Sequence, residues 1–296
     1  MQALAVVPNG IYVDGTFGRG GHTRAILDRL GPDGRLIAID RDPDAIAAAR
    51  LLAAADRRLT VVASRFGAMA EALRGVGMVG RVQGILLDLG VSSPQLDTPE
   101  RGFSFSADGP LDMRMDPDLG ESAGAWLLRA DADAIAAVLR EFGEERFAGR
   151  IARAIVAARA DSSAFTTRGL AELIARCVPT REPGKHPATR TFQALRILIN
   201  DELGELRQGL AQACDLLTTA GRLVVISFHS LEDRIVKRFM RDEALGPQLP
   251  KGLPVTATES RGRLRLIGKP IRPGSAEVAD NPRSRSAVLR VAERLP

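Results

Sequence analysis

A glycine-rich turn near the N-terminus has the residue types that a nucleotide-binding loop requires. An apolar run at 11–13 ends at Asp14, and positions 23–30 show the apolar spacing of a helix. Glycine adopts positive φ angles readily and lets a ligand approach the main chain closely. The stretch therefore predicts a strand, a ligand-binding turn and a helix. The turn contains four glycines, namely Gly15, Gly18, Gly20 and Gly21.

A second carboxylate follows at the spacing of a ribose-binding acid. Asp40 ends the apolar run 35–40, about twenty residues beyond the turn, as in a half-Rossmann unit that binds the ribose hydroxyls. The alternative is that Asp40 caps the next helix. Asp42 precedes Pro43 and is the better N-cap, so we expect Asp40 to be available for a ligand.

The turn lacks the signature of a dinucleotide site. A G-x-G-x-x-G fingerprint read from Gly18 has Thr23 in place of the third glycine, which disfavours a hydride-transferring dehydrogenase. Asp14 would also repel a diphosphate, whereas a cationic or zwitterionic ligand tolerates it. S-adenosylmethionine (AdoMet), which carries a sulfonium and an amino acid group, fits better.

Two further apolar runs, 59–63 and 82–90, predict the third and fourth strands of a doubly wound sheet, whose loops line one crevice at the carboxyl ends. Phe66 follows the third strand and would lie beside an adenine ring. A phenylalanine at such a place is also frequently part of the core. Asp88 brings a further carboxylate to the crevice.

The loop after Asp88 is the candidate for the chemistry, and it contains Ser92, Ser93 and Pro94. Methyltransferases acting on exocyclic amines tend to have a short polar segment with proline here. The lone pair of such an amine is delocalised, so oxygen acceptors orient the nitrogen, and orientation can lower a barrier by about 7–11 kcal/mol. The alternative is a turn that only ends the strand.

The apolar spacing from residue 97 to 199 is helical throughout. It predicts an all-helical domain at 97–199, inserted into an α/β domain formed by 1–96 and 200–296. The insert ends in 185–196, where basic and aromatic residues either contact phosphates and a base or form a solvated helix end. The candidate RNA contacts there are Lys185, Arg190 and Arg196.

A fifth strand is predicted at 221–228, and the residues after it would reach the same crevice. His229 and Ser230 are therefore candidates to touch the acceptor base. Ser230 is also the expected N-cap of the following helix, since two acids occupy the first turn.

The basic residues gather towards the C-terminus. The chain has a formal net charge of +5, but residues 234–296 contain 14 basic and 6 acidic residues. This excess predicts a polyanionic partner. The runs 263–267 and 286–291 predict a closing antiparallel strand pair. Arg283 and Arg285, in the turn before the last strand, are candidate phosphate contacts, with an exposed charged turn as the alternative.

Several classes of site are disfavoured. Cys177 and Cys214 are far apart and form no CxxC pair, and the three histidines include no helical i, i+4 pair, so we expect neither a disulfide framework nor a metal site. No apolar run approaches the length of a membrane span. We expect a cytoplasmic protein without a membrane partner.

Segments spread in order over nearly the whole chain carry a family resemblance: Tyr12–His22, Asp88–Leu96, Glu100–Phe105, Gly109–Asp116, His186–Arg196, Ser227–Arg234 and Asn281–Ser286. Together they closely resemble the RsmH (MraW) family of bacterial methyltransferases. The family usually has an upstream segment containing His-x-Pro-Val-Leu, whereas Met1 here stands almost at the first strand.

The resemblance implies a class I AdoMet-dependent methyltransferase sheet, Rossmann-like, with an inserted all-helical domain for substrate recognition. It implies AdoMet-dependent methylation of N4 of a cytidine in the decoding region of small-subunit (16S) ribosomal RNA, in an assembled or late-assembling subunit, after base flipping. A homodimer is a further expectation. The implied AdoMet pocket contains Gly20, Gly21, His22, Asp40, Phe66, Asp88 and Gln95.

Two alternatives share parts of this pattern. An AdoMet-dependent DNA amino-methyltransferase would use the same chemistry on a cytosine of DNA. A ribosome-assembly factor could bind RNA, and AdoMet, without catalysis.

Overall fold

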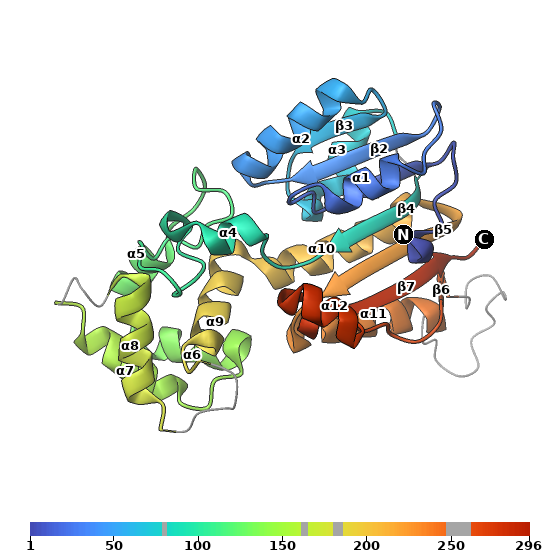
Figure 1. The fold of residues 1–296 in the computed structure, drawn as a ribbon. Coiled ribbons are helices and arrows are strands. Elements are labelled where there is room, and N and C mark those ends of the chain that lie inside the picture. Colours follow the sequence, from blue (N-terminus) through green and yellow to red (C-terminus); the bar gives the residue numbers. More distant parts are fainter. Residues whose placement is uncertain (79–81, 161–164, 180–185, 247–261) are drawn as a thin grey trace, which may run out of the picture. The chain divides into compact units, whose positions relative to one another are not determined.

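The computed structural model describes residues 1–78, 82–160, 165–179, 186–246 and 262–296 (Figure 1). The chain forms two compact units, one of residues 1–90 and 203–296 and one of residues 91–202. The boundaries expected after residues 96 and 199 lie a few residues away, so the segment 91–96 belongs to the helical unit.

A seven-stranded sheet forms the centre of the first unit. Its order is β3-β2-β1-β4-β5-β7-β6, in which β7 runs antiparallel to its two neighbours and the other pairs are parallel. This confirms the predicted class I, Rossmann-like methyltransferase sheet and the closing antiparallel pair. The strands are β1 (Ile11–Asp14), β2 (Arg35–Asp40), β3 (Leu59–Ala63), β4 (Val82–Asp88), β5 (Leu217–Ser227), β6 (Leu264–Leu266) and β7 (Val288–Arg294).

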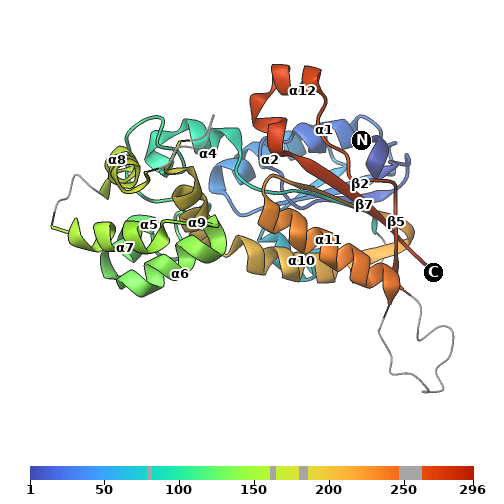
Figure 2. The ribbon, with the colours of Figure 1, turned by 90° about the horizontal axis from the view of Figure 1, so that it is seen from below.

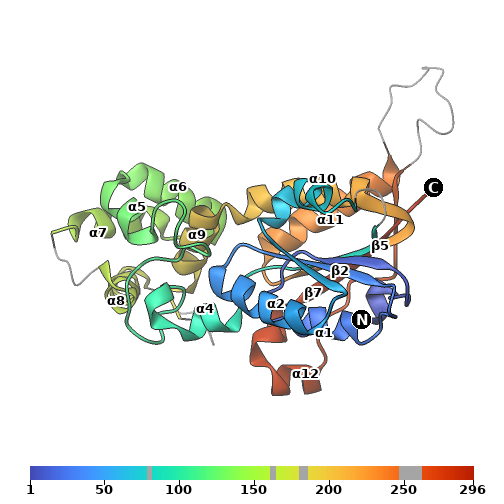
Figure 3. The same ribbon diagram turned by 90° about the horizontal axis from the view of Figure 1, so that it is seen from above.

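Alternating side chains of the strands build a core on each face of the sheet. In β2, Leu36 and Ala38 belong to one cluster, with residues of α1 and α2, whereas Ile37 and Ile39 belong to another, with residues of α3, α10 and α11. Figures 2 and 3 show these helices on the two faces. The helices are α1 (Gly21–Leu27), α2 (Pro43–Ala55), α3 (Met69–Gly75), α10 (Glu202–Leu216), α11 (Ser230–Leu245) and α12 (Ser275–Asp280), with 3-10 turns η1 (Gln2–Leu4), η2 (Phe66–Ala68) and η5 (Pro282–Ser286).

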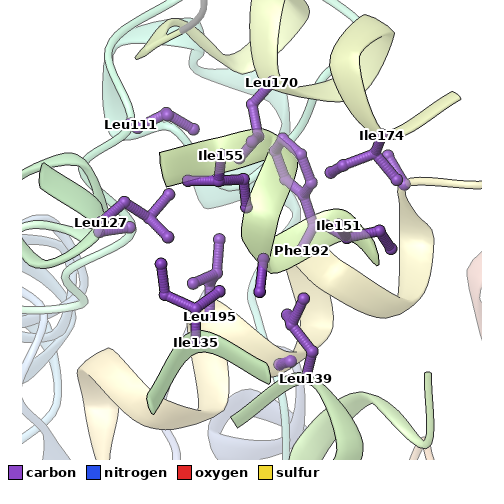
Figure 4. Close-up of a cluster of buried hydrophobic side chains, with 14 of the residues drawn as sticks. Leu111, Leu127, Ile135, Leu139, Ile151, Ile155, Leu170, Ile174, Phe192 and Leu195 are labelled. Carbon is purple, nitrogen blue, oxygen red and sulfur yellow. The ribbon is translucent and has the colours of Figure 1, made fainter. Parts of the chain in front are cut away.

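The second unit is helical in its described residues, apart from an isolated bridge between Pro110 and Thr166. Figure 4 shows its core, in which Leu111, Ile155 and Phe192 lie among other buried side chains. No helix among the described residues of either unit has the length and apolar character needed to span a membrane. The elements of this unit are α4 (Ser93–Asp97), η3 (Pro99–Arg101), α5 (Ala123–Arg129), α6 (Ala132–Gly143), α7 (Ala148–Ala157), α8 (Thr167–Cys177) and α9 (Thr189–Asn200).

The core of the helical unit offers a direct test of its packing. Ile155→Ala should lower the free energy of unfolding by about 2–5 kcal/mol, because it leaves a cavity beside a side chain that is 1% exposed. Leu128→Ala, at a leucine that is 50% exposed, is the matched control and should change stability by less than about 1 kcal/mol. Urea denaturation measures both; equal losses would contradict this packing.

Candidate functional site

Parallel strands bring the predicted carboxylates to one edge of the sheet. Asp14 ends β1 and pairs in register with Ala38 of β2 and Leu86 of β4. Asp40 and Asp88 end those two strands, so all three acids lie at the carboxyl edge. The structure thus assembles three residues that are far apart in the sequence.

The glycine turn needs glycine for different reasons at different positions. Gly18 and Gly20 have φ angles of 52° and 72°, in the left-handed region. A Cβ atom on Gly20 would lie 2.7 Å from the ring of Phe17. Gly21 begins α1, and apart from its chain neighbours and the backbone of its own helix no described atom lies within 4 Å of the place of a Cβ there. Packing therefore explains Gly20 but not Gly21.

Asp14 is a fully buried acid beneath this turn. Its carboxylate accepts hydrogen bonds from the Thr23 hydroxyl at 2.7 Å and from the Thr16 backbone N–H at 3.2 Å. Burial raises the pKa of Asp14 to about 6, and the Thr23 bond and nearby His22 oppose that shift. Asp14 can therefore change charge near neutral pH.

His22 and Asp88 form the pair on the other side of the turn. The His22 Nε2 atom lies 3.2 Å from Asp88 Oδ2, and the hydrogen bond to Asp88 raises the pKa of His22. The Asp88 backbone N–H donates to the Thr16 hydroxyl oxygen at 2.7 Å, which fixes the strand end. Asp88 Oδ1 is buried and has no hydrogen-bond partner among the described residues. Such an atom calls for a ligand donor or a bound water.

Asp40, a predicted ligand contact, also accepts hydrogen bonds from the backbone. Asp40 Oδ2 accepts from Gly18 N–H at 2.8 Å, and Oδ1 accepts from the N–H groups of Arg41 and Asp42 at 2.8 and 2.9 Å. These bonds occupy most of the carboxylate's lone-pair positions. Asp40 therefore helps to hold the glycine turn, and its contact with a ribose stays a prediction. Asp42 is the N-cap of α2, as predicted, and accepts from Asp44 N–H.

Phe66 packs against α10, which lies more than a hundred residues later in the chain. A Cβ atom on Gly209 of α10 would lie 2.6 Å from the Phe66 ring, so glycine makes room for that ring. The Gln212 amide oxygen accepts from Ala70 N–H at 2.8 Å, and the amide nitrogen donates to Gly67 O. This packing supports the core interpretation of Phe66, and its adenine contact stays a prediction.

His229 is the N-cap of α11, so the assignment of that role to Ser230 was wrong. His229 Nδ1 accepts from Glu232 N–H at 3.4 Å, while Glu232 Oε2 accepts from Phe228 N–H at 2.8 Å and from His229 N–H at 3.3 Å. His229 Nε2 lies 3.2 Å from Glu232 Oε1. Both ring nitrogens thus face Glu232, and Ser230 is an exposed first residue of the helix.

The Ser-Ser-Pro segment begins a helix of the second unit. Ser92 is the N-cap of α4 in a capping box, and its backbone N–H donates to the Gln95 side-chain oxygen at 2.9 Å. Gln95 is 5% exposed. Ser93 and Pro94 are the first residues of α4, where the proline is tolerated. The amide oxygen of Gln95 thus has a structural partner, and the contacts of this segment with cofactor or base stay predictions.

Two of the residues that the sequence predicts as RNA contacts of the insert make hydrogen bonds within the protein. Arg196 forms two hydrogen bonds to Glu202, at 2.7 and 2.9 Å, and its contact with RNA stays a prediction. Arg190 donates to Glu144 O at 2.5 Å. Phe192 is buried and cannot stack a base. Lys185 lies outside the described residues.

Arg283 and Arg285, the other predicted phosphate contacts, are both exposed on η5. Their position agrees equally with a phosphate contact and with a charged surface turn.

Sequence reasoning missed two kinds of residue at this site. Thr16 lies within the glycine turn and Thr23 lies just after it. Because a buried carboxylate such as that of Asp14 needs hydrogen-bond donors, the Thr16 N–H and the Thr23 hydroxyl serve it. Arg41 and Glu205 form a buried ion pair at 3.2 Å, and burial raises the pKa of Glu205. No local sequence signal indicates that pair, because α10 is remote from β2 in the chain.

Comparison with known proteins decides the family. Residues 1–295 match the model of the MraW methylase family. The chain belongs to the MraW methylase family. This confirms the resemblance seen in the motifs.

Two curated relatives agree with the MraW assignment. "Ribosomal RNA small subunit methyltransferase H" of Thioalkalivibrio sulfidiphilus is 62% identical over 296 residues, covering 100% of this chain and 94% of that protein. The protein of the same name from Aromatoleum aromaticum is 61% identical over 295 residues, covering 99% and 94%. The similarity therefore extends over both units of this chain.

The two glycines at the start of α1 should respond differently to alanine. Gly20→Ala should lower the free energy of unfolding by about 1–3 kcal/mol, because of its left-handed φ and the Phe17 ring. Gly21→Ala should leave stability unchanged or raise it by up to about 1 kcal/mol, since alanine favours a helix. Thermal unfolding measures both, with Gly75→Ala in α3 as a control in open space. Equal losses at both positions would contradict this geometry.

Proposed function

We propose that this protein transfers a methyl group from AdoMet to N4 of a cytidine in the decoding region of small-subunit ribosomal RNA. The observation that carries the proposal is Asp88, paired with His22 and with its Oδ1 atom buried and unpartnered, at the edge of a methyltransferase sheet. The names of the relatives support ribosomal RNA as the substrate.

The residues at this edge fit AdoMet. Gly21 has open space where a Cβ would lie, so a ligand can approach the main chain there. Asp14 and Asp88 place negative charge beside the turn, which favours a ligand with ammonium and sulfonium groups and disfavours a diphosphate. Asp88 Oδ1 offers an acceptor to a ligand hydroxyl or N–H.

AdoMet supplies an electrophilic methyl group, and the protein's task is to orient the acceptor amine. We assign that orientation to the segment Ser92–Pro94 of α4, which begins with the capping box of Ser92. His229 positions the start of α11 through Glu232, because its Nδ1 accepts from the Glu232 backbone N–H and its Nε2 lies 3.2 Å from the Glu232 carboxylate. His229 is thus a positioning residue. The acceptor amine needs no strong base, because its orientation towards the methyl group accelerates the transfer.

The cellular setting follows from the substrate. A ribosomal RNA methyltransferase works where small subunits assemble, which makes this a cytoplasmic protein acting on an assembled or late-assembling subunit. The helical unit contributes substrate recognition, and Arg283 and Arg285 on η5 contact phosphates through their exposed side chains. A homodimer is the oligomeric state to test by light scattering.

The deciding experiment measures methyl incorporation from labelled AdoMet into small subunits purified from cells that lack the enzyme. We expect label on N4 of a cytidine, identified by mass, and little label in naked RNA or a cytosine-bearing oligodeoxynucleotide.

Asp88→Asn should lower kcat/KM by about tenfold to a hundredfold, because it removes a charged hydrogen-bond partner of His22.

Three results would count against this function. Label in DNA alone would favour a DNA amino-methyltransferase. AdoMet binding without turnover on any substrate would favour a non-catalytic assembly factor. A folded Asp88→Asn variant with the wild-type rate would remove Asp88 from the reaction.

The affinity for AdoMet should depend on pH through Asp14. Its pKa is raised to about 6, so Asp14 is protonated well below pH 6 and ionised above it. A cationic ligand binds the ionised form better, and binding should be about tenfold weaker at about pH 5 than at about pH 7. His22, whose pKa is also raised, adds a change of the same sign as it loses its proton.

Isothermal titration calorimetry across this pH range separates the two groups. Asp14→Asn should flatten the profile and leave only the part that belongs to His22. Asp33→Asn, at an exposed aspartate, should keep the full profile. A wild-type affinity that stays constant over the range would contradict the role of Asp14.

A further inference from the structure

Helix α11 carries four cations on one side. Arg234, Lys237, Arg238 and Arg241 are spaced i, i+3, i+4 and i+7, which places them within about 100° of arc at 3.6 residues per turn. All four are exposed. We call these four residues the α11 stripe. Ser230 stands four residues before Arg234 and shares this side of the helix.

The opposite side of α11 faces the core, which fixes the rotation of the helix. Val236 and Met240 are each 1% exposed and belong to the cluster beneath the sheet. Figures 2 and 3 show α11 lying lengthwise against the same face as α10. The α11 stripe therefore points away from the core.

The acids of α11 offset only part of this charge. Glu232 is buried in the capping box with His229. Asp233 pairs with Arg290 of β7 at 2.7 and 3.0 Å, and Glu243 pairs with Arg263 at 2.7 and 2.8 Å. Asp242, 2.7 Å from Arg241, is the one exposed acid of the helix. The helix thus directs most of its acids towards the sheet and its cations outward.

The position of the helix connects the α11 stripe to the candidate active site. α11 begins directly after β5 and His229, at the carboxyl edge of the sheet where Asp14 and Asp88 also lie. From Arg234 to Arg241 the stripe extends over about 10 Å at 1.5 Å per residue. A strand of RNA leaving the site could follow the helix away from that edge.

We propose that the α11 stripe binds the phosphate backbone of the RNA segment next to the target nucleotide. The inference rests on the proposed function and assigns a contact surface to it. Three guanidinium groups and one ammonium, with no aromatic or amide side chain among them, suit phosphates and not base edges. The contact would add affinity without sequence preference and would weaken with salt.

The test compares two double variants that remove the same charge. Lys237→Ala with Arg238→Ala removes the centre of the stripe. The control, Arg50→Ala with Arg57→Ala, removes two exposed arginines in and just after α2, on the other face of the sheet. Binding of small-subunit RNA, measured by filter binding across salt concentrations, needs no turnover.

We expect the stripe variant to bind RNA at least about tenfold more weakly at low salt. The slope of the logarithm of the binding constant against the logarithm of the salt concentration should become shallower by about 1.4, because each phosphate contact to a single strand contributes about 0.7 and two contacts are lost. AdoMet affinity should match the wild type. Lys237→Glu with Arg238→Glu should weaken binding further.

A stripe variant with the same slope and affinity as the control would overturn the inference, and methylation by the wild type would still stand. Weaker AdoMet binding in the stripe variant would assign these residues to the stability of the site and would also overturn it. Unchanged RNA affinity with poor methylation of intact subunits would indicate contact with a ribosomal protein and not with RNA. Failure of the wild type to methylate any RNA concerns the proposed function alone.

Discussion

The loop between β1 and α1 makes hydrogen bonds to all three acidic residues at one edge of the sheet, and the candidate site depends on it. Thr16 contributes twice, since its N–H donates to Asp14 and its hydroxyl accepts from the backbone of Asp88. Gly18 donates to Asp40. Negative charges gathered in this way repel one another, so N–H and O–H donors must hold them in place. The same loop thus fixes the acids and leaves Asp88 Oδ1 as an acceptor for a ligand.

Helix α10 supports this edge from the side of the core. Glu205, Gly209 and Gln212 stand on successive turns of one face and contact the segment that follows β3. Glu205 also pairs with Arg41, which follows Asp40. The loops after β2 and β3 are therefore held by one helix, and the buried charge of Glu205 is matched by Arg41. Removal of Arg41 would take away the ion-pair partner of a glutamate that is only 4% exposed.

The sequence predicted what depends on local pattern. The apolar runs at 35–40 and 59–63 match β2 and β3, and Asp42 caps α2 as expected from Pro43. Partners remote in the chain could not be read in this way. Nothing local indicates that Gly209 receives the Phe66 ring. His229 was missed as an N-cap because histidine is not among the usual capping residues, although Glu232 at N3 completes the box.

The chain order of the strands has a consequence for biosynthesis. β7 lies between β5 and β6, and it is the last strand to be made. The sheet therefore cannot complete its pairing until almost the whole chain has left the ribosome. The helical unit spans residues 91–202 and is finished well before that point. Since domains fold as units during synthesis, the inserted unit can become compact before residues 203–296 of the sheet unit have been synthesised.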